Sequence, residues 1–131
     1  MNPAFVHKKF IFNEKIDEDY IFSLYQYDYA YIAEVFNNSL ESLKEETHYF
    51  TSAYESSDIT TLKKATHKIK PLFGFTGLLH HQEMMGRFEH LCENASNTTN
   101  ITMQYMELVE MIKDGKNILK DDCNRLTEFI S

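Results

Sequence analysis

The stretch that decides the fold runs from residue 59 to residue 77 and reads ITTLKKATHKIKPLFGFTG. Each residue of an α-helix turns the chain by about 100°, so the direction of every side chain follows from counting. The apolar and small residues of the stretch then fall on one side; they are Leu62, Ala65, Ile69, Leu72 and Thr76. This stripe predicts a helix with one buried face, running from Ile59 toward Gly77 after the capping residues Ser56-Ser57-Asp58.

Three more amphipathic helices are expected around this one. The first should be about 25 residues long, with Asp28 as its N-cap and a stripe of Ile32, Phe36, Leu40, Leu43, Thr47, Phe50 and Tyr54. Another carries Met84, Phe88 and Leu91. After a polar loop at 94–100, the last helix has a stripe of Met106, Val109, Ile112, Leu119, Cys123, Leu126 and Ile130. Lys116 falls where this last stripe requires an apolar residue.

The beginning of the chain has a weaker pattern. Residues 1–16 are expected to be extended or disordered, and Asp17 to Tyr25 to form a short leading helix. The tyrosines from Tyr25 to Tyr31 alternate with the period of a strand, but the helical stripe that starts at Ile32 favours a junction between helices. The sequence therefore predicts an all-α fold, a single domain over residues 1–131. Its architecture would be an antiparallel four-helix bundle with a short additional N-terminal helix.

Composition agrees with one helical domain. The 131 residues are 43% apolar, with only 4 glycines and 2 prolines. Cys92 and Cys123 have no second thiol nearby in the sequence, so we expect core thiols rather than a disulfide or a zinc site. No window approaches the roughly 18 apolar residues of a membrane span, so we expect a soluble, cytoplasmic protein that does not bind membranes.

The distribution of charge is uneven. Lys and Arg number 13 against 20 Asp and Glu, a formal net charge of -7 that argues against nucleic acid as a partner. Between Ile59 and Gln82, however, there are four lysines and no acid. One basic segment therefore belongs to an otherwise acidic molecule.

His67 lies at the centre of this basic segment. It falls opposite the buried stripe, so it should point outward, surrounded on the same face by Thr60, Lys63, Lys64, Lys70, Pro71 and Gly74. Lys70, one turn on, could donate hydrogen bonds to a phosphoryl group on the histidine. Gly74, two turns on, predicts a notch through which another protein reaches the imidazole. Pro71 removes the hydrogen bond to the carbonyl of His67 and predicts a kink there.

Each of these features also has an ordinary structural interpretation. An exposed histidine among lysines is usually a solvated surface, and a proline with a glycine can mark the bend or end of a helix. The combination of an outward histidine, a lysine one turn on and a glycine two turns on is what favours a functional site.

The run from Ala65 to Leu78 resembles the signature of the histidine phosphotransfer (HPt) family. That signature has a histidine, an aliphatic residue two later, a lysine three later and a glycine ten later; His67, Ile69, Lys70 and Gly77 meet it. The segment Phe88-Glu89-His90-Leu91 fits a second apolar-acid-apolar pattern of the family. Pro71 departs from the glycine that many members have after the lysine, and His81 replaces a usual aliphatic residue.

The resemblance implies a function in a two-component phosphorelay. His67 would become a phosphohistidine, accepting a phosphoryl group from the aspartate of one receiver domain and passing it to another, and Lys70 would steady that group. The partners would be receiver domains of hybrid sensor kinases and response regulators. Partner contacts are expected at Lys63, Lys64, Pro71, Gly74, Phe75 and Leu78. No nucleotide-binding motif of a kinase is present, so the protein would be a monomeric carrier without a cofactor, and Mg²⁺ would come with the receiver.

Two other functions remain open. The step from Glu45 to His48 is the Glu-x-x-His spacing of metal-carboxylate bundles, but that site needs two such steps and only one is present. A second alternative is a non-phosphorylated adaptor of the same fold that binds receiver or kinase domains. Retention of His67 and Lys70 argues against it.

Overall fold

The computed structural model describes residues 9–131, and within them every regular element is a helix. In chain order these are α1 (Glu18–Tyr25), α2 (Tyr29–Glu55), α3 (Ile59–Phe75), α4 (Leu79–Asn94), the short 3-10 helix η2 (Thr98–Ile101) and α5 (Thr102–Ile130). The expected all-α class is confirmed, including the short leading helix. The four tyrosines 25–31 lie at the junction of α1 and α2, as the helical interpretation required.

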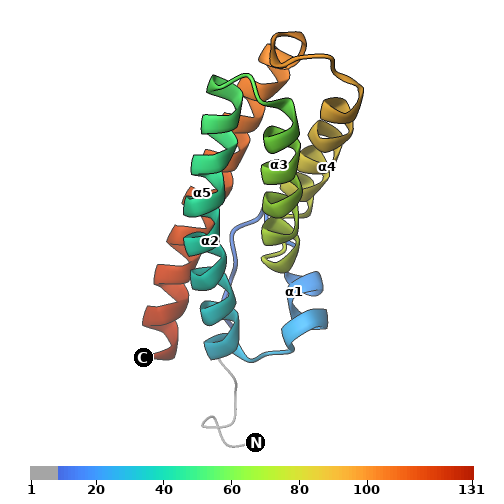
Figure 1. Cartoon of the computed structure of the whole chain (residues 1–131). Coiled ribbons are helices and arrows are strands. Elements are labelled where there is room, and N and C mark those ends of the chain that lie inside the picture. Colours follow the sequence, from blue (N-terminus) through green and yellow to red (C-terminus); the bar gives the residue numbers. More distant parts are fainter. Residues whose placement is uncertain (1–8) are drawn as a thin grey trace, which may run out of the picture.

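Helices α2 to α5 form an antiparallel four-helix bundle (Figure 1). Helix α2 packs against α3 and α5, and α4 packs against α3 and α5, which closes the ring. Short connections at 56–58 and 76–78 make α2–α3 and α3–α4 antiparallel hairpins.

Aspartates begin three of the helices. Asp17, Asp28 and Asp58 each accept a hydrogen bond from the backbone N–H three residues later, at 3.0 Å in every case. Such caps satisfy one of the N–H groups that a helix start leaves without a partner. At Asp58, hydrogen bonds from the Thr61 hydroxyl and amide also lower the pKa of the carboxyl group. The N-caps expected at Asp28 and Asp58 are confirmed.

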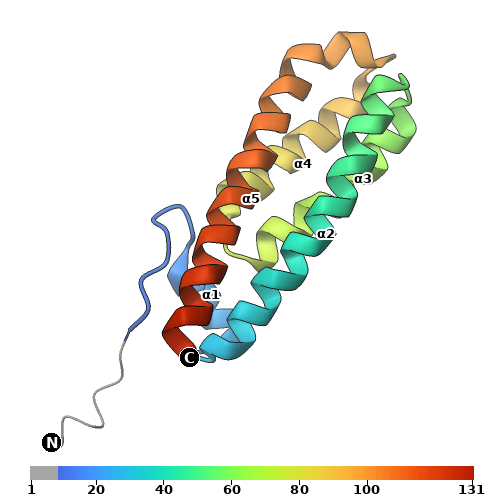
Figure 2. The same ribbon diagram turned by 90° about the vertical axis from the view of Figure 1, so that its left-hand side faces the viewer.

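The N-terminal segment 9–16 covers one end of the bundle. Because α3 and α4 have 17 and 16 residues and α2 and α5 have 27 and 29, the longer pair extends past the shorter pair (Figure 2). Phe10 and Phe12 are buried there, and aromatic contacts join them to Phe22, Tyr29, Phe36 and Phe129. Residues 9–16 are therefore a packed, non-helical segment and not disordered; residues 1–8 lie outside the described part.

Polar contacts fix this segment to α5. The carboxylate of Asp122, buried on α5, accepts a hydrogen bond from the Asn13 amide at 2.6 Å and pairs with Arg125 at 2.8 Å. Arg125 also donates to the carbonyl of Ile11 at 2.8 Å and stacks over the ring of Phe10. The buried charge at Asp122 thus has partners, as burial of a charge requires.

The buried stripe of α5 differs from the predicted one at both ends. Met106 and Ile130 are 62% and 44% exposed, and Tyr105 and Leu108 are buried instead. In mid-helix the buried position is Gly115, not its neighbour Lys116; a Cβ atom on this glycine would lie 2.5 Å from Cε1 of Phe73. The ring of Phe73, which reaches from α3 across the core to Gly115, therefore explains the glycine that follows Asp114, and the lysine does not interrupt the core.

The turn between α3 and α4 depends on Gly77. Its φ of 75° lies in the left-handed region, and a Cβ there would come within 3.0 Å of Ile16 and Ile21. Its carbonyl accepts a hydrogen bond from the amide of Asp17 at 2.9 Å. The turn is thereby joined to the start of α1.

Candidate functional site

His67 projects from the middle of α3 into solvent. Its side chain is 71% exposed, whereas Leu62 and Ile69 on the opposite side of the helix are fully buried. The outward direction predicted by counting is confirmed. Pro71 lies within α3, one turn beyond the histidine, and the helix continues through it to Phe75.

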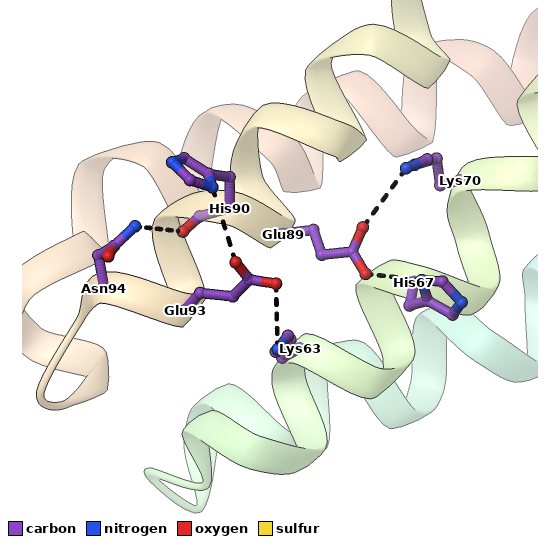
Figure 3. A network of polar contacts seen from close by, with 7 residues as sticks. All are labelled: Lys63, His67, Lys70, Glu89, His90, Glu93 and Asn94. Carbon is purple, nitrogen blue, oxygen red and sulfur yellow. Dashed lines mark hydrogen bonds and ion pairs between the residues drawn. The ribbon is translucent and has the colours of Figure 1, made fainter.

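Glu89 on α4 holds the imidazole of His67 (Figure 3). Its Oε2 lies 2.6 Å from Nδ1 of the histidine, and its side chain is only 16% exposed. An ionised carboxylate accepts, so Nδ1 directs a hydrogen toward Glu89, and whenever the ring is neutral its lone pair lies on Nε2. Among residues 9–131 no group hydrogen-bonds Nε2. The arrangement therefore presents a nucleophilic nitrogen to solvent.

Lys70 shares the same carboxylate. Its Nζ lies 3.5 Å from Oε1 of Glu89, at the upper limit of a hydrogen bond, and its side chain is 39% exposed. The lysine head therefore lies beside α4, not freely in solvent as its helical position alone suggested. Glu89 brings the two residues of the expected pair together from the neighbouring helix.

A second ion-pair group lies along the same helix pair. Lys63 pairs with Oε1 of Glu93 at 3.1 Å, and Nδ1 of His90 lies 3.6 Å from the other oxygen (Figure 3). The hydrogen bond and charge of Lys63 lower the pKa of Glu93. Lys63 is thus engaged with α4, whereas Lys64 is exposed.

Gly74 and Leu78 cannot contact a partner as predicted. Gly74 is buried, because the side chain of Gln82 on α4 lies over it; a Cβ atom on the glycine would overlap the Gln82 amide. The expected notch is therefore filled. Leu78, after the end of α3, is fully buried in the core. Phe75, by contrast, is 52% exposed and remains on the surface with part of Pro71.

His81 belongs to the core. Its side chain is 3% exposed, and Nε2 lies 3.0 Å from Asp114 on α5, which also pairs with Lys15. Its Nδ1 has no hydrogen-bond partner. Burial lowers the pKa of the imidazole, and the hydrogen bond and charge of Asp114 oppose that shift. His81, which replaces a usual aliphatic residue of the HPt pattern, thus links α4 through Asp114 to α5 and to the N-terminal segment.

Residues 9–131 contain neither a metal-binding cluster nor a membrane-spanning helix. No group of three or more His, Cys, Asp and Glu side chains is placed to hold a metal ion, and His48 is exposed. In the same part of the chain, none of the helices combines the length and apolarity that crossing a membrane requires.

Glu89 is the site residue that sequence reasoning missed. The sequence pattern Phe88-Glu89-His90-Leu91 included this acid, but it did not predict a contact between Glu89 and His67. The antiparallel α3–α4 hairpin supplies that contact, because residues at equal distances from its turn lie opposite each other. Four pairs across the hairpin are symmetric about Leu78; they are His67 with Glu89, Lys63 with Glu93, Lys70 with Gly86, and Gly74 with Gln82.

Comparison with known proteins is consistent with this geometry. No protein-family model and no curated protein matches the sequence. Among solved structures, the chain is similar to the HPT domain of the Hpt sensor hybrid histidine kinase from Shewanella, with a TM-score of 0.73 and 15% identity. The alignment covers 85% of this chain and 95% of that domain. The helical hairpin that carries His67 and Glu89 therefore belongs to a chain with the HPt-domain fold.

Proposed function

We propose that this protein is a histidine phosphotransfer protein of a two-component phosphorelay, and that His67 carries the phosphoryl group. The observation that carries the proposal is the pairing of an exposed imidazole, through its Nδ1, with the largely buried carboxylate of Glu89. That pairing supports Nε2 as the phosphorylated atom. The HPt-domain fold supports receiver domains as donors and acceptors.

The transfer needs no proton to move. The Nε2 lone pair attacks the phosphorus of an aspartyl phosphate, the P–O bond to the aspartate breaks, and the carboxylate leaves with the bonding electrons. The Nδ1 hydrogen stays in its bond to Glu89, whose negative charge balances the positive charge that develops on the ring. Because every group keeps its proton, the same path runs backward when a second receiver presents a free aspartate.

Lys70 is the group that supports the phosphorylated state. Its bond to Glu89 is long, so the ammonium can turn toward the phosphoryl oxygens at small cost. A phosphoryl group brings nearly two negative charges, which Lys70 and the exposed Lys64 partly neutralise. Mg²⁺ would be held by the carboxylates of the receiver. Lys63, Lys64, Pro71 and Phe75 remain proposed contacts to that receiver.

The setting of this relay would be the cytoplasm, with the protein acting as a monomer. Cys92 and Cys123 are both free thiols buried in the core, as expected from the sequence. Burial raises the pKa of Cys92 to about 11, so this thiol is unreactive at neutral pH. Two unpaired thiols fit a reducing compartment.

Direct phosphorylation tests the proposal. The protein is incubated with a phosphorylated receiver domain and Mg²⁺, and the phosphoryl group that it takes up should be acid-labile and alkali-stable. His67→Gln should take up none and remain folded, because the side chain is exposed. His48→Gln, which changes an exposed histidine on α2, is the matched control and should label normally. Equal labelling of His67→Gln would overturn the assignment.

A further inference from the structure

An apolar groove lies between α4 and α5, away from His67. Its lining comes from both helices and includes Met84, Phe88, Leu91, Glu107 and Leu108. Leu91 follows Glu89 by two residues, a rotation of about 200° around the axis of α4. Because Glu89 faces His67 on α3, Leu91 points to the other side of α4. The groove is therefore separate from the candidate phosphoryl-accepting site.

Two exposed methionines extend this apolar groove across the outer side of α5. Met103 is 76% exposed and Met106 is 62% exposed, and no other large apolar side chain in residues 9–131 is as exposed as Met103. Met106 lines a second hollow with Val109, and Glu107 borders both hollows. Methionine side chains are flexible and are common on surfaces that bind helices of varied sequence. We call Met84, Leu91, Met103, Met106 and Val109 the methionine surface.

Acidic residues border the methionine surface. Positions 88–112 contain four glutamates and neither lysine nor arginine. Two of these glutamates, Glu89 and Glu93, are engaged by side chains of α3. Within residues 9–131, the other two, Glu107 and Glu110, are exposed and take part in no ion pair. These two carboxylates can therefore bind cations of a partner.

The nearest cations in the sequence do not cancel this negative charge. Arg87, at the α4 edge of the groove, is paired with Glu83 at 2.6 Å. Lys113 lies one turn after Glu110 on α5, and among residues 9–131 it forms no ion pair with that glutamate. The charge that the methionine surface offers to a partner is therefore negative.

We propose that the methionine surface binds an amphipathic helix of another protein, one whose apolar row is flanked by lysine or arginine. The apolar row would pack into the groove between α4 and α5, and the flanking cations would pair with Glu107 and Glu110. A second copy of this chain fits less well, because a symmetric contact would set these glutamates against their own copies. The bound helix leaves Nε2 of His67 open to solvent. This inference goes beyond the proposed phosphotransfer function and does not depend on it.

A synthetic helix tests the proposal directly. The probe is a peptide with leucine at every third or fourth position and lysine on both flanks, and its twin has glutamate in place of lysine. With the methionine methyl groups labelled by carbon-13, the NMR signals of Met84, Met103 and Met106 should shift when the lysine peptide is added. The signal of Met85, which is fully buried, should stay in place. The glutamate peptide should bind at least roughly tenfold more weakly, and His67→Gln should bind the lysine peptide as the wild type does.

Variants separate the apolar contribution from the charge. Met106→Gln removes apolar contact, and Glu107→Lys combined with Glu110→Lys reverses the charge; each change should weaken binding of the lysine peptide roughly tenfold. Tyr49→Gln and Glu34→Lys make the matched changes at exposed positions of α2 and should bind normally.

Several outcomes would overturn the proposal. They are no binding of the lysine peptide, equal binding of the two peptides, shifts confined to other parts of the molecule, and full affinity in either the Met106 or the charge-reversed variant. Shifts of Met103 and Met106 that depend on protein concentration alone would identify a second copy of the chain as the occupant, and would overturn the proposal as well.

Discussion

Nδ1 of His67 lies 2.6 Å from Oε2 of Glu89, and the two residues stand symmetrically on either side of Leu78, 22 positions apart. The carboxylate is supplied by the register of the α3–α4 hairpin and not by the helix that carries the histidine. It fixes which ring nitrogen bears the hydrogen, and hence which one faces solvent as a nucleophile.

Glu89→Ala should release the ring of His67. Without the acceptor, the neutral imidazole should move toward the Nε2–H tautomer, which removes the lone pair from the exposed nitrogen. A charge-assisted hydrogen bond contributes about 1.5–3 kcal/mol, so transfer should slow roughly ten- to a hundredfold. Nitrogen-15 NMR of the imidazole reports the tautomer, and single-turnover labelling reports the rate. Glu93→Ala, which breaks the Lys63 pair instead, should change neither.

Lys70→Ala should weaken the phosphorylated state while the helix content stays the same. The side chain is 39% exposed, so its loss removes a charge and little packing. The phosphohistidine should hydrolyse or return its phosphoryl group several-fold faster, since a cation one turn away no longer balances the added charge. Circular dichroism and the decay of the labelled protein measure the two quantities. Unchanged decay and unchanged transfer in both directions would leave Lys70 a solvated surface residue.

Gly74→Leu should destabilise the protein. Its helical position suggested an exposed site where a larger residue would be tolerated, but the Gln82 side chain occupies that space. Forcing side chains into a filled site costs typically about 1–3 kcal/mol. Gly86→Ala on α4 should instead stabilise the fold by up to about 1 kcal/mol. Urea unfolding of both variants measures the difference, and a Gly74→Leu protein as stable as the wild type would contradict the buried position.

Stability should fall as the pH drops below about 6.5, in part because of His81. Burial lowers the pKa of this imidazole in the folded protein, so the unfolded chain takes up a proton first. The free energy of unfolding therefore decreases from the unfolded-state pKa down to the lower folded-state pKa, and no further below it. His81→Leu should remove this part of the slope. Urea titrations of the wild type and of His81→Leu at several pH values measure the slope, and equal slopes in the two proteins would contradict the role of His81.

Much of the fold follows from local rules. The caps at Asp28 and Asp58, the single buried stripe of α3 and the outward position of His67 all depend on residues close in sequence, and each was predictable. Gly74 was wrongly predicted to be exposed, because a helical projection considers one helix without its neighbours. It lies in line with His67 on α3, yet Gln82 from α4 covers it.

The site was only half predictable for the same reason. Lys70 follows His67 on the same helix, but Glu89 comes from the next helix. Gly77 is a sequence signal for a turn at 76–78. If the two helices are paired symmetrically about that turn, Glu89 falls opposite His67. The Asp122 contacts with the N-terminal segment have no such signal, since Asn13 is 109 residues away.

The contact between Asn13 and Asp122 determines when the N-terminal segment can fold into its final place. The segment 9–16 is synthesised well before the groups that hold it, because Asp122 lies 109 residues after Asn13 and Arg125 lies 114 residues after Ile11. On the ribosome, the aromatic rings of Phe10 and Phe12 must therefore wait for the C-terminal turns of α5 before they are buried. Closing a loop of this length is slow compared with forming a helical hairpin. The hairpin that carries His67 and Glu89 can thus form early, while residues 9–16 take their final place only after Asp122 and Arg125 have emerged.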